Sequence, residues 1–263
     1  MSRRRVPIDT FGIKGHRIWP KKATLPVGYT FISKWGMVWE VTENCGGGRY
    51  RIYSEGIYVI RSAKEIKSGQ VLHPCDRNVY GVGYLGIGKY TYSENKHRSD
   101  CWRAMFKRCY ETNNNYLSYS QVEVCESWHN FQLFAEWYDD NYKTGWDLDN
   151  DLKDFEGARC YSPTTCCFLP PKLNKQLSNT YEAVPTKEGR KYRAKISFNG
   201  KTYEIGRFLC WKNALCAQVL YRFSAIEGEI RGIFGEDFVY KYWTPQRLHK
   251  LIDRSVSVAE SKI

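Results

Sequence analysis

The sequence contains no apolar run close to the roughly eighteen residues that a membrane-spanning helix needs. Its first residues, Met1–Pro7, lack the apolar core of a secretory signal. None of its ten cysteines has the Cys-x-x-Cys spacing that is typical of zinc and redox motifs. These absences predict a soluble cytoplasmic protein with no membrane partner. Buried free thiols are favoured over a disulfide framework and over a zinc site built from scattered cysteines.

The charges are numerous and unevenly placed along the chain. Lysine and arginine outnumber aspartate and glutamate by 40 to 28, which leaves a net charge of +12. The cations concentrate in residues 3–22 and 187–222, and the acids lie between them in residues 136–156. Such a surplus favours a polyanionic partner, because neutralising phosphates releases counterions. Basic flanks around an acidic centre suit a DNA-binding protein with a metal site, although a solvated acidic helix end would leave the same pattern.

Residues 1–24 are expected to form a basic arm, and residues 25–95 a small β-rich domain with a glycine-rich connector. From Tyr29 onward apolar residues alternate with polar or small ones, and the glycines at 46–48 mark a turn. The connector includes the stretch YGVGYLGIGKY, at residues 80–90. Its glycines do not match a dinucleotide-binding fingerprint, so we interpret it as a linker or an ordered strap and not as a phosphate loop.

Two amphipathic helices are predicted at the start of a central segment that spans residues 96–180. Apolar residues recur at positions i, i+3, i+4 and i+7, once over 102–109 and once over 131–138. Packing in a core is the favoured interpretation of both stripes. His129, at the start of the second helix, is predicted to be a capping or core residue rather than a catalytic group.

The stretch LDNDLKDFEGARCYSPTTCCFLPPKLN, at residues 148–174, has the order of a β-hairpin followed by a helix. Asp149 and Asp151 flank Asn150 at the end of the first strand, and a Pro-Pro pair opens the helix that carries Asn174. Oxygen ligands of this kind suit Mg²⁺ or Mn²⁺ better than zinc. Aspartate in a tight turn and asparagine near a helix start are also common capping residues, so a purely structural role is the alternative.

The clearest local pattern lies in residues 185–230. Apolar residues at positions 192, 194, 196 and 198 alternate with polar ones, and Asn199-Gly200 is a strong signal for a two-residue hairpin. A returning strand and an amphipathic helix follow. The pattern predicts a hairpin or three-stranded sheet that is backed by a helix and has a basic exposed face. Residues 231–263 are expected to be a C-terminal tail with a short helix over 245–254.

Several segments carry a resemblance to known families. The segments CWRAMFKRCY, VCESWHNFQLFAEWY, LDNDL and YSPTTCCFLPPKLN resemble, in this order, the HNH (His-Me finger) endonuclease-like proteins common in bacteriophages. The segment GRKYRAKISFNGKTYEIGRFLCWKNALCAQ looks like the Apetala-type DNA-binding domain often fused behind such nucleases. Together they cover about half of the chain. The implied fold is α+β, with a small N-terminal β-barrel-like domain, a central ββα-metal module with a helical lead, and a C-terminal three-stranded sheet plus helix.

The resemblance also implies a catalytic site in the hairpin. Asp149 matches the metal-binding acid of the family, Asn150 the usual histidine and Asn174 the helix asparagine, while Asp151 is a nearby acid. The implied catalytic residues are therefore Asp149, Asn150, Asp151 and Asn174, with Mg²⁺ or Mn²⁺ held by Asp149 and Asn174. Asparagine cannot act as a general base near neutral pH. Either an aspartate or a metal-bound hydroxide replaces the histidine, or the domain is inactive.

The function implied is that of a phage endonuclease, of homing type, that cleaves double-stranded DNA in the host bacterial cytoplasm. The predicted DNA contacts come from basic residues of the C-terminal sheet: Arg190, Lys191, Arg193, Lys195, Lys201 and Arg207. The alternative is a catalytically degenerate DNA-binding protein on a nuclease scaffold, acting in regulation or against host defence. A third hypothesis assigns a host protein partner to the N-terminal β domain.

Overall fold

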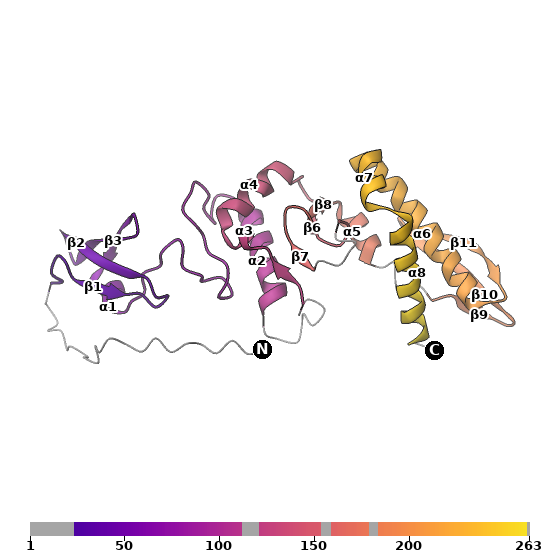
Figure 1. The fold of residues 1–263 in the computed structure, drawn as a ribbon, viewed down its shortest axis with the longest axis horizontal. Helices are drawn as coiled ribbons and strands as arrows, with labels where there is room; N and C mark the ends of the chain where they lie inside the picture. Colours follow the sequence, from indigo (N-terminus) through magenta and orange to yellow (C-terminus); the bar gives the residue numbers. More distant parts are fainter. Residues whose placement is uncertain (1–23, 112–120, 154–158, 179–183, 262–263) are drawn as a thin grey trace. The chain divides into compact units, whose positions relative to one another are not determined.

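The computed structural model describes residues 24–111, 121–153, 159–178 and 184–261. The chain combines helices and strands, as expected, and divides into two compact units between Asp76 and Arg77 (Figure 1). Among the described helices, none is both long and apolar enough to cross a bilayer. The basic arm that the sequence predicts at residues 1–24 lies outside the described residues, except for its last position.

The first unit is a four-stranded antiparallel sheet in the order β1-β2-β3-β4, followed by one short helix. Its elements are β1 (Thr30–Ile32), β2 (Val38–Gly46), β3 (Arg49–Ser54), β4 (Ile57–Ser62) and α1 (Ala63–Lys67). One face carries the core, which includes Trp39, Val41 and Ile52. β1 and β4 are the edges of this sheet and are not paired with each other, so the sheet is open where the sequence predicted a barrel-like domain.

The second unit begins with the glycine-rich connector and a helical layer. The helices are α2 (Lys96–Tyr110), α3 (Glu126–His129) and α4 (Phe131–Asn141). The two predicted stripes are confirmed as core, since Trp102, Phe106 and Phe134 are among the fully buried side chains. His129 is also structural: its Nε2 lies 2.9 Å from the backbone oxygen of Val124. The short strands β5 (Glu123–Val124) and β7 (Cys160–Tyr161) pair in parallel beside this layer.

The connector is an ordered strap that is fixed by one buried glutamine. Gln132 Nε2 donates to the backbone oxygens of Leu85, at 3.0 Å, and of Tyr90, at 2.9 Å. Its Oε1 accepts the N–H of Tyr90 at 2.9 Å. A side chain at Gly88 would collide with this amide, which explains why the strap needs glycine where it lies on α4.

The hairpin predicted over residues 148–174 is present. The strands β6 (Asp147–Asp149) and β8 (Cys167–Leu169) pair antiparallel, with Asp149 opposite Cys167. The helix α5 (Pro171–Ser178) follows two residues after β8. The residues between the strands of the predicted hairpin include Phe155, Glu156 and Gly157, which lie outside the described residues.

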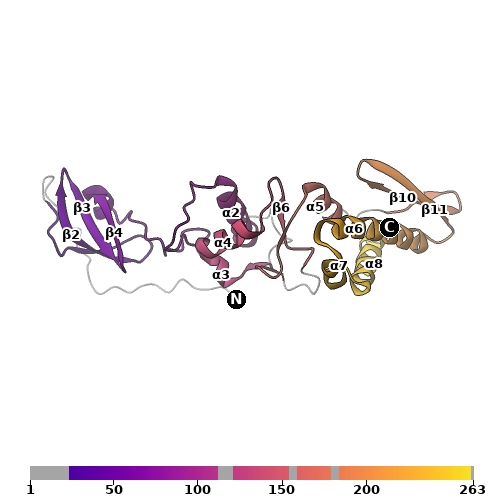
Figure 2. The same ribbon diagram turned by 90° about the horizontal axis from the view of Figure 1, so that it is seen from above.

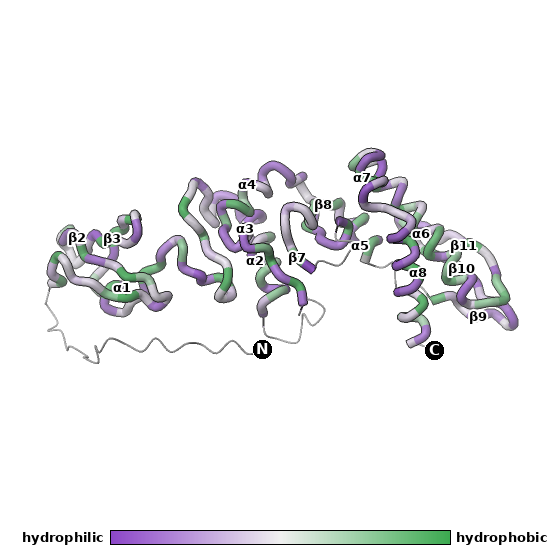
Figure 3. Tube along the Cα trace, viewed as in Figure 1, coloured by the Kyte–Doolittle hydropathy of each residue, from purple (hydrophilic) through white to green (hydrophobic). Residues whose placement is uncertain are grey.

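The C-terminal part is a three-stranded antiparallel sheet in the order β11-β10-β9, with three helices (Figures 1 and 2). Its elements are β9 (Thr186–Glu188), β10 (Lys191–Phe198), β11 (Lys201–Phe208), α6 (Trp211–Phe234), α7 (Glu236–Tyr242) and α8 (Pro245–Glu260). The predicted hairpin turn is confirmed, because Asn199 and Gly200 both have positive φ, at 50° and 76°. The short helix predicted over residues 245–254 is confirmed as part of α8, whereas the rest of the segment expected as a tail completes α6 and forms α7. Hydrophilic and hydrophobic residues are interspersed in these helices (Figure 3).

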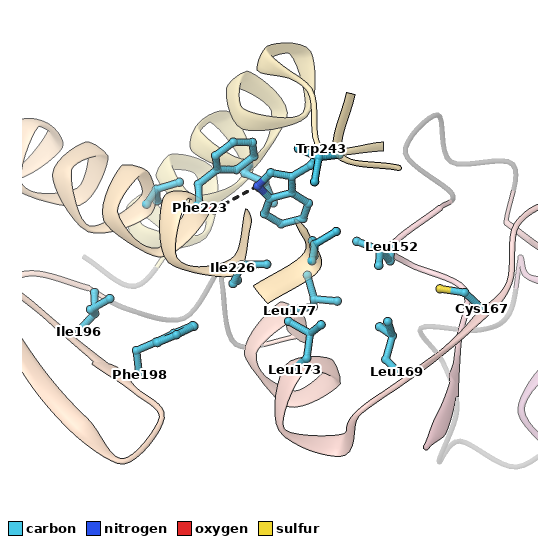
Figure 4. Close-up of a cluster of buried hydrophobic side chains, with 14 residues drawn as sticks. Leu152, Cys167, Leu169, Leu173, Leu177, Ile196, Phe198, Phe223, Ile226 and Trp243 are labelled. Atoms are coloured by element: carbon cyan, nitrogen blue, oxygen red, sulfur yellow. Dashed lines mark hydrogen bonds between the residues drawn. The ribbon is translucent and has the colours of Figure 1, made fainter. Parts of the chain in front are cut away.

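One hydrophobic core joins the hairpin to the C-terminal part. Leu152, Leu169 and Leu173 from the hairpin region share this core with Ile226 of α6 and Trp243, which follows α7 (Figure 4). The indole N–H of Trp243 donates to the backbone oxygen of Phe223 at 3.1 Å, and the two rings stack. The hairpin is therefore packed into the same body as the C-terminal helices.

Candidate functional site

The turn after β6 brings three of the four predicted catalytic residues together. Asp149, the last residue of β6, is only 5% exposed, whereas Asn150 is half-buried and Asp151 is exposed. The Oδ1 atom of Asp149 accepts the N–H of Leu152 at 2.8 Å. The carboxylate also accepts a hydrogen bond from the backbone of Asp151. Asp149 thus closes the turn in the manner of aspartates that bond to their own following backbone.

A residue that the sequence did not single out completes this turn. Arg247, in the first turn of α8, is 7% exposed. Its Nη1 donates to the backbone oxygen of Leu152 at 2.7 Å, and its Nη2 donates to that of Asp151 at 3.1 Å. Its guanidinium lies over the ring of Trp243, 4.8 Å from the ring centre. The sequence signal that places Arg247 in the first turn of a helix is the capping residue Thr244. In the structure its Oγ1 accepts the N–H of Arg247.

Burial dominates the electrostatics of the turn. Loss of solvent, followed by the negative charge of Asp151, raises the pKa of Asp149 to about 7. The backbone hydrogen bond from Leu152 and the positive charge of Arg247 act in the opposite direction. Burial also raises the pKa of Cys167, which lies opposite Asp149, to about 12. Near neutral pH the turn therefore contains a carboxyl group that is partly protonated, next to a neutral thiol.

The described side chains do not fit a hydrated divalent cation. Mg²⁺ keeps several waters, but Asp149 is almost enclosed and already bonds to the turn backbone. The facing Cys167 is a protonated thiol, and Asn174 is a half-buried residue on α5. Within the described ranges, no group of three or more His, Cys, Asp and Glu side chains is placed to hold a metal ion. Two further acids of this loop, Asp154 and Glu156, lie outside those ranges.

The second candidate site is the open face of the β9–β10–β11 sheet. Along β10, Ala194, Ile196 and Phe198 are buried on the side that α6 covers (Figure 2). Lys191 and Lys195 alternate with them and are exposed on the other side. The strand alternation thus separates a core face from a solvent face, as the sequence predicted.

Two of the six predicted DNA-contacting residues are engaged in ion pairs on this face. Glu188 lies between two arginines: Arg193 Nη1 is 2.9 Å from its Oε1, and Arg207 Nε is 3.2 Å from its Oε2. Arg207 Nη1 also contacts Glu204 at 2.5 Å. The other four residues are exposed and make no ion pair within the part of the chain that the structure describes: Arg190, Lys191, Lys195 and Lys201.

A local irregularity fixes the position of Lys195. The register between β10 and β11 shifts between Ala194 and Lys195, so that Ile205 has no direct partner. The buried Gln218 of α6 donates from its Nε2 to the backbone oxygen of Lys195 at 2.7 Å. The helix therefore holds the strand at this point, and the sequence pattern alone did not reveal the bulge.

Comparisons of this chain with models of protein families, with curated proteins and with solved structures find no match.

Proposed function

We propose that the chain binds double-stranded DNA through the solvent face of the β9–β10–β11 sheet. The observation that carries this proposal is the pair of exposed lysines on this face, Lys191 and Lys195, which make no ion pair among the described residues and lie on a strand that α6 holds through Gln218. Arg190, in the turn before β10, and Lys201, at the start of β11 opposite Phe198, are exposed cations beside this face. Cations of this kind neutralise phosphates and release counterions. In this proposal the sheet and α6 correspond to the Apetala-type domain, and β6, β8 and α5 correspond to the ββα hairpin of the HNH proteins.

The two kinds of cation on the sheet support different roles. The exposed lysines and Arg190 have flexible side chains, which suits contacts with the phosphate backbone. Arg193 and Arg207 are held by Glu188, so their planar donor groups are fixed in orientation. A fixed guanidinium suits bidentate contact with a base edge in the major groove. We therefore assign phosphate contacts to most of the basic residues and base contacts to the minority.

The proposal is tested by removing the charges of Lys191 and Lys195 and measuring the affinity for DNA. Replacing both by alanine is expected to weaken binding to a DNA duplex by about tenfold or more and to reduce the slope of log K against log salt by about two. The affinity is measured by fluorescence anisotropy over a series of salt concentrations. The control is Lys34→Ala with Lys64→Ala, which removes two exposed charges from the first unit. Equal losses in both double variants would show that net charge, and not this face, drives binding.

Metal-dependent cleavage of DNA is the second candidate function. It is favoured by the order of β6, β8 and α5, with Asp149 at the end of β6 and Asn174 on the helix. Two observations oppose it. Asn150 stands where the resemblance places the general base, and the carboxylate of Asp149 is bonded within the turn.

In a nicking assay we expect the native chain, with Mg²⁺ or Mn²⁺, to convert no more supercoiled plasmid than the Asp149→Asn variant does. Both proteins are compared at equal concentration, with agarose gels as the readout. Nicking by the native chain that Asp149→Asn abolishes would establish the endonuclease and reject the degenerate scaffold.

A further inference from the structure

We propose that Arg247 supplies the fixed positive charge of the Asp149 turn, the charge that the HNH resemblance assigns to a divalent cation. The hairpin then folds and keeps its shape without a metal ion at this place. The proposal concerns the structure of the hairpin and is independent of whether the sheet binds DNA.

The first support is the position of the guanidinium at the turn. Arg247 bonds to two consecutive backbone oxygens, those of Asp151 and Leu152. The carboxylate of Asp149 bonds to the backbone N–H groups of the same two residues. The backbone N–H and C=O groups of these two residues are thus satisfied by one buried guanidinium and one buried carboxyl group. A metal ion bound to Asp149 would have to displace bonds that the turn already makes.

The second support is the balance of charge. Besides burial and the backbone hydrogen bonds, the charged groups that act on Asp149 are Asp151, which is negative, and Arg247, which is positive. Lys153 and Arg247 are the cations that act on the neighbouring Cys167. A buried carboxylate requires an opposite charge or hydrogen bonds, and here the chain provides both. A divalent ion would have to enter beside a guanidinium that already lies at this turn.

The third support is the way in which α8 holds the arginine. Leu251, one turn after Arg247, is buried in the core that also contains Leu152 and Trp243. Thr244 caps the start of the helix, and the ring of Trp243 lies under the guanidinium. These contacts fix the backbone and the side chain of Arg247 before any ligand binds. A preorganised arginine is a permanent counter-charge, whereas a metal ion would dissociate.

The experiment compares thermal unfolding of the EDTA-treated full chain with and without Mn²⁺. A ligand that binds only the folded state raises the unfolding temperature. We expect the native unfolding temperature to be unchanged by Mn²⁺. A rise with Mn²⁺ that disappears in Asp149→Asn would overturn the proposal.

Arginine variants provide the second arm. Arg247→Met is expected to lower the unfolding temperature by about 10 °C, because breaking a buried charge network is strongly destabilising. Arg247→Lys keeps the positive charge but loses the guanidinium that bonds to both backbone oxygens. Its unfolding temperature is expected to lie between those of Arg247→Met and the native chain. The matched control is Arg254→Met, at an exposed position of the same helix. If Arg247→Met is as stable as Arg254→Met, the proposal is overturned. If Arg247→Met does not fold, the comparison of the native chain with and without Mn²⁺ still tests whether the turn binds a metal ion.

Discussion

Replacing Gln132 by methionine is expected to lower the free energy of unfolding of the second unit by about 3 to 5 kcal/mol. Methionine nearly matches the shape of glutamine but can neither donate nor accept as the amide does. The variant therefore loses the three hydrogen bonds that fix the strap, two to Tyr90 and one to Leu85. Their backbone groups would remain without a partner beside a packed core, which is the costly part of the change.

The strap backbone lies so close to its neighbours that it has little room to shift when the hydrogen bonds of Gln132 are lost. A side chain at Gly86 would collide with Asn130, and one at Gly88 with Gln132 itself. At Gly83 an added Cβ would lie 2.9 Å from the indole of Trp102. The strap backbone is thus pressed onto α2 and α4, and it cannot move inward to replace the lost hydrogen bonds.

Urea unfolding followed by tryptophan fluorescence measures the change for Gln132→Met. The control is Gln246→Met, which makes the same substitution at an exposed position in the first turn of α8. The control is expected to change stability by less than about 0.5 kcal/mol. A loss below about 1 kcal/mol for Gln132→Met would mean that the strap is not held by this side chain.

Between pH 5 and pH 8 the native chain is expected to lose about 2 to 3 kcal/mol of stability relative to Asp149→Asn. The cause is the pKa of Asp149, which burial raises from 3.8 to about 7 in the folded state. Asparagine does not titrate, and its side-chain oxygen retains an acceptor for the N–H of Leu152. The difference between the two proteins therefore isolates the ionisation of this one group.

The sign of this change in stability with pH follows from the number of protons that the folded and the unfolded chain bind. Between the two pKa values the folded chain holds a proton on Asp149 that the unfolded chain has released, so stability decreases as pH rises. The stabilising contribution of Asp149 is fully present below a pH of about 3.8 and is lost as pH rises through about 7.

Stability curves in urea at several pH values, for native chain and Asp149→Asn, provide the measurement. Asp140→Asn, at an exposed position near the end of α4, is the control for removing an acid elsewhere. If the native chain and Asp149→Asn keep a constant difference across this range, the carboxyl group of Asp149 is not buried as described.

The local patterns that the sequence predicted correctly depend on short-range periodicity. The alternation over residues 192–198 separates two faces of a strand, and the spacing over 102–109 and 131–138 marks the buried sides of two helices. The Asn199-Gly200 turn needs only two residues to be recognised, because both adopt positive φ without strain. These features are set by neighbours in the chain, so the chain alone reveals them.

The features that the sequence did not reveal depend on distant residues. Arg247 bonds to Asp151 and Leu152 because α8 packs against the hairpin through the shared core. Asp149 is buried for the same reason, because the C-terminal helices pack on the hairpin. The sequence suggested an accessible metal ligand at this position, whereas the structure has a buried carboxyl group that closes a turn. On the sheet, the position of Glu188 between Arg193 and Arg207 depends on the pairing of three strands. Such contacts have no signature in spacing.

The shared core also limits how this protein could exchange parts with others during evolution. The leucines at 152, 169 and 173 are covered by residues from the far end of the chain, among them Trp243 and Leu251. A gene fragment that carried the hairpin alone would encode a segment with an uncovered apolar side. Recombination that moved the hairpin into another protein would therefore have to transfer α7 and α8 together with it. The hairpin and the helices α7 and α8 are therefore expected to be inherited as one piece.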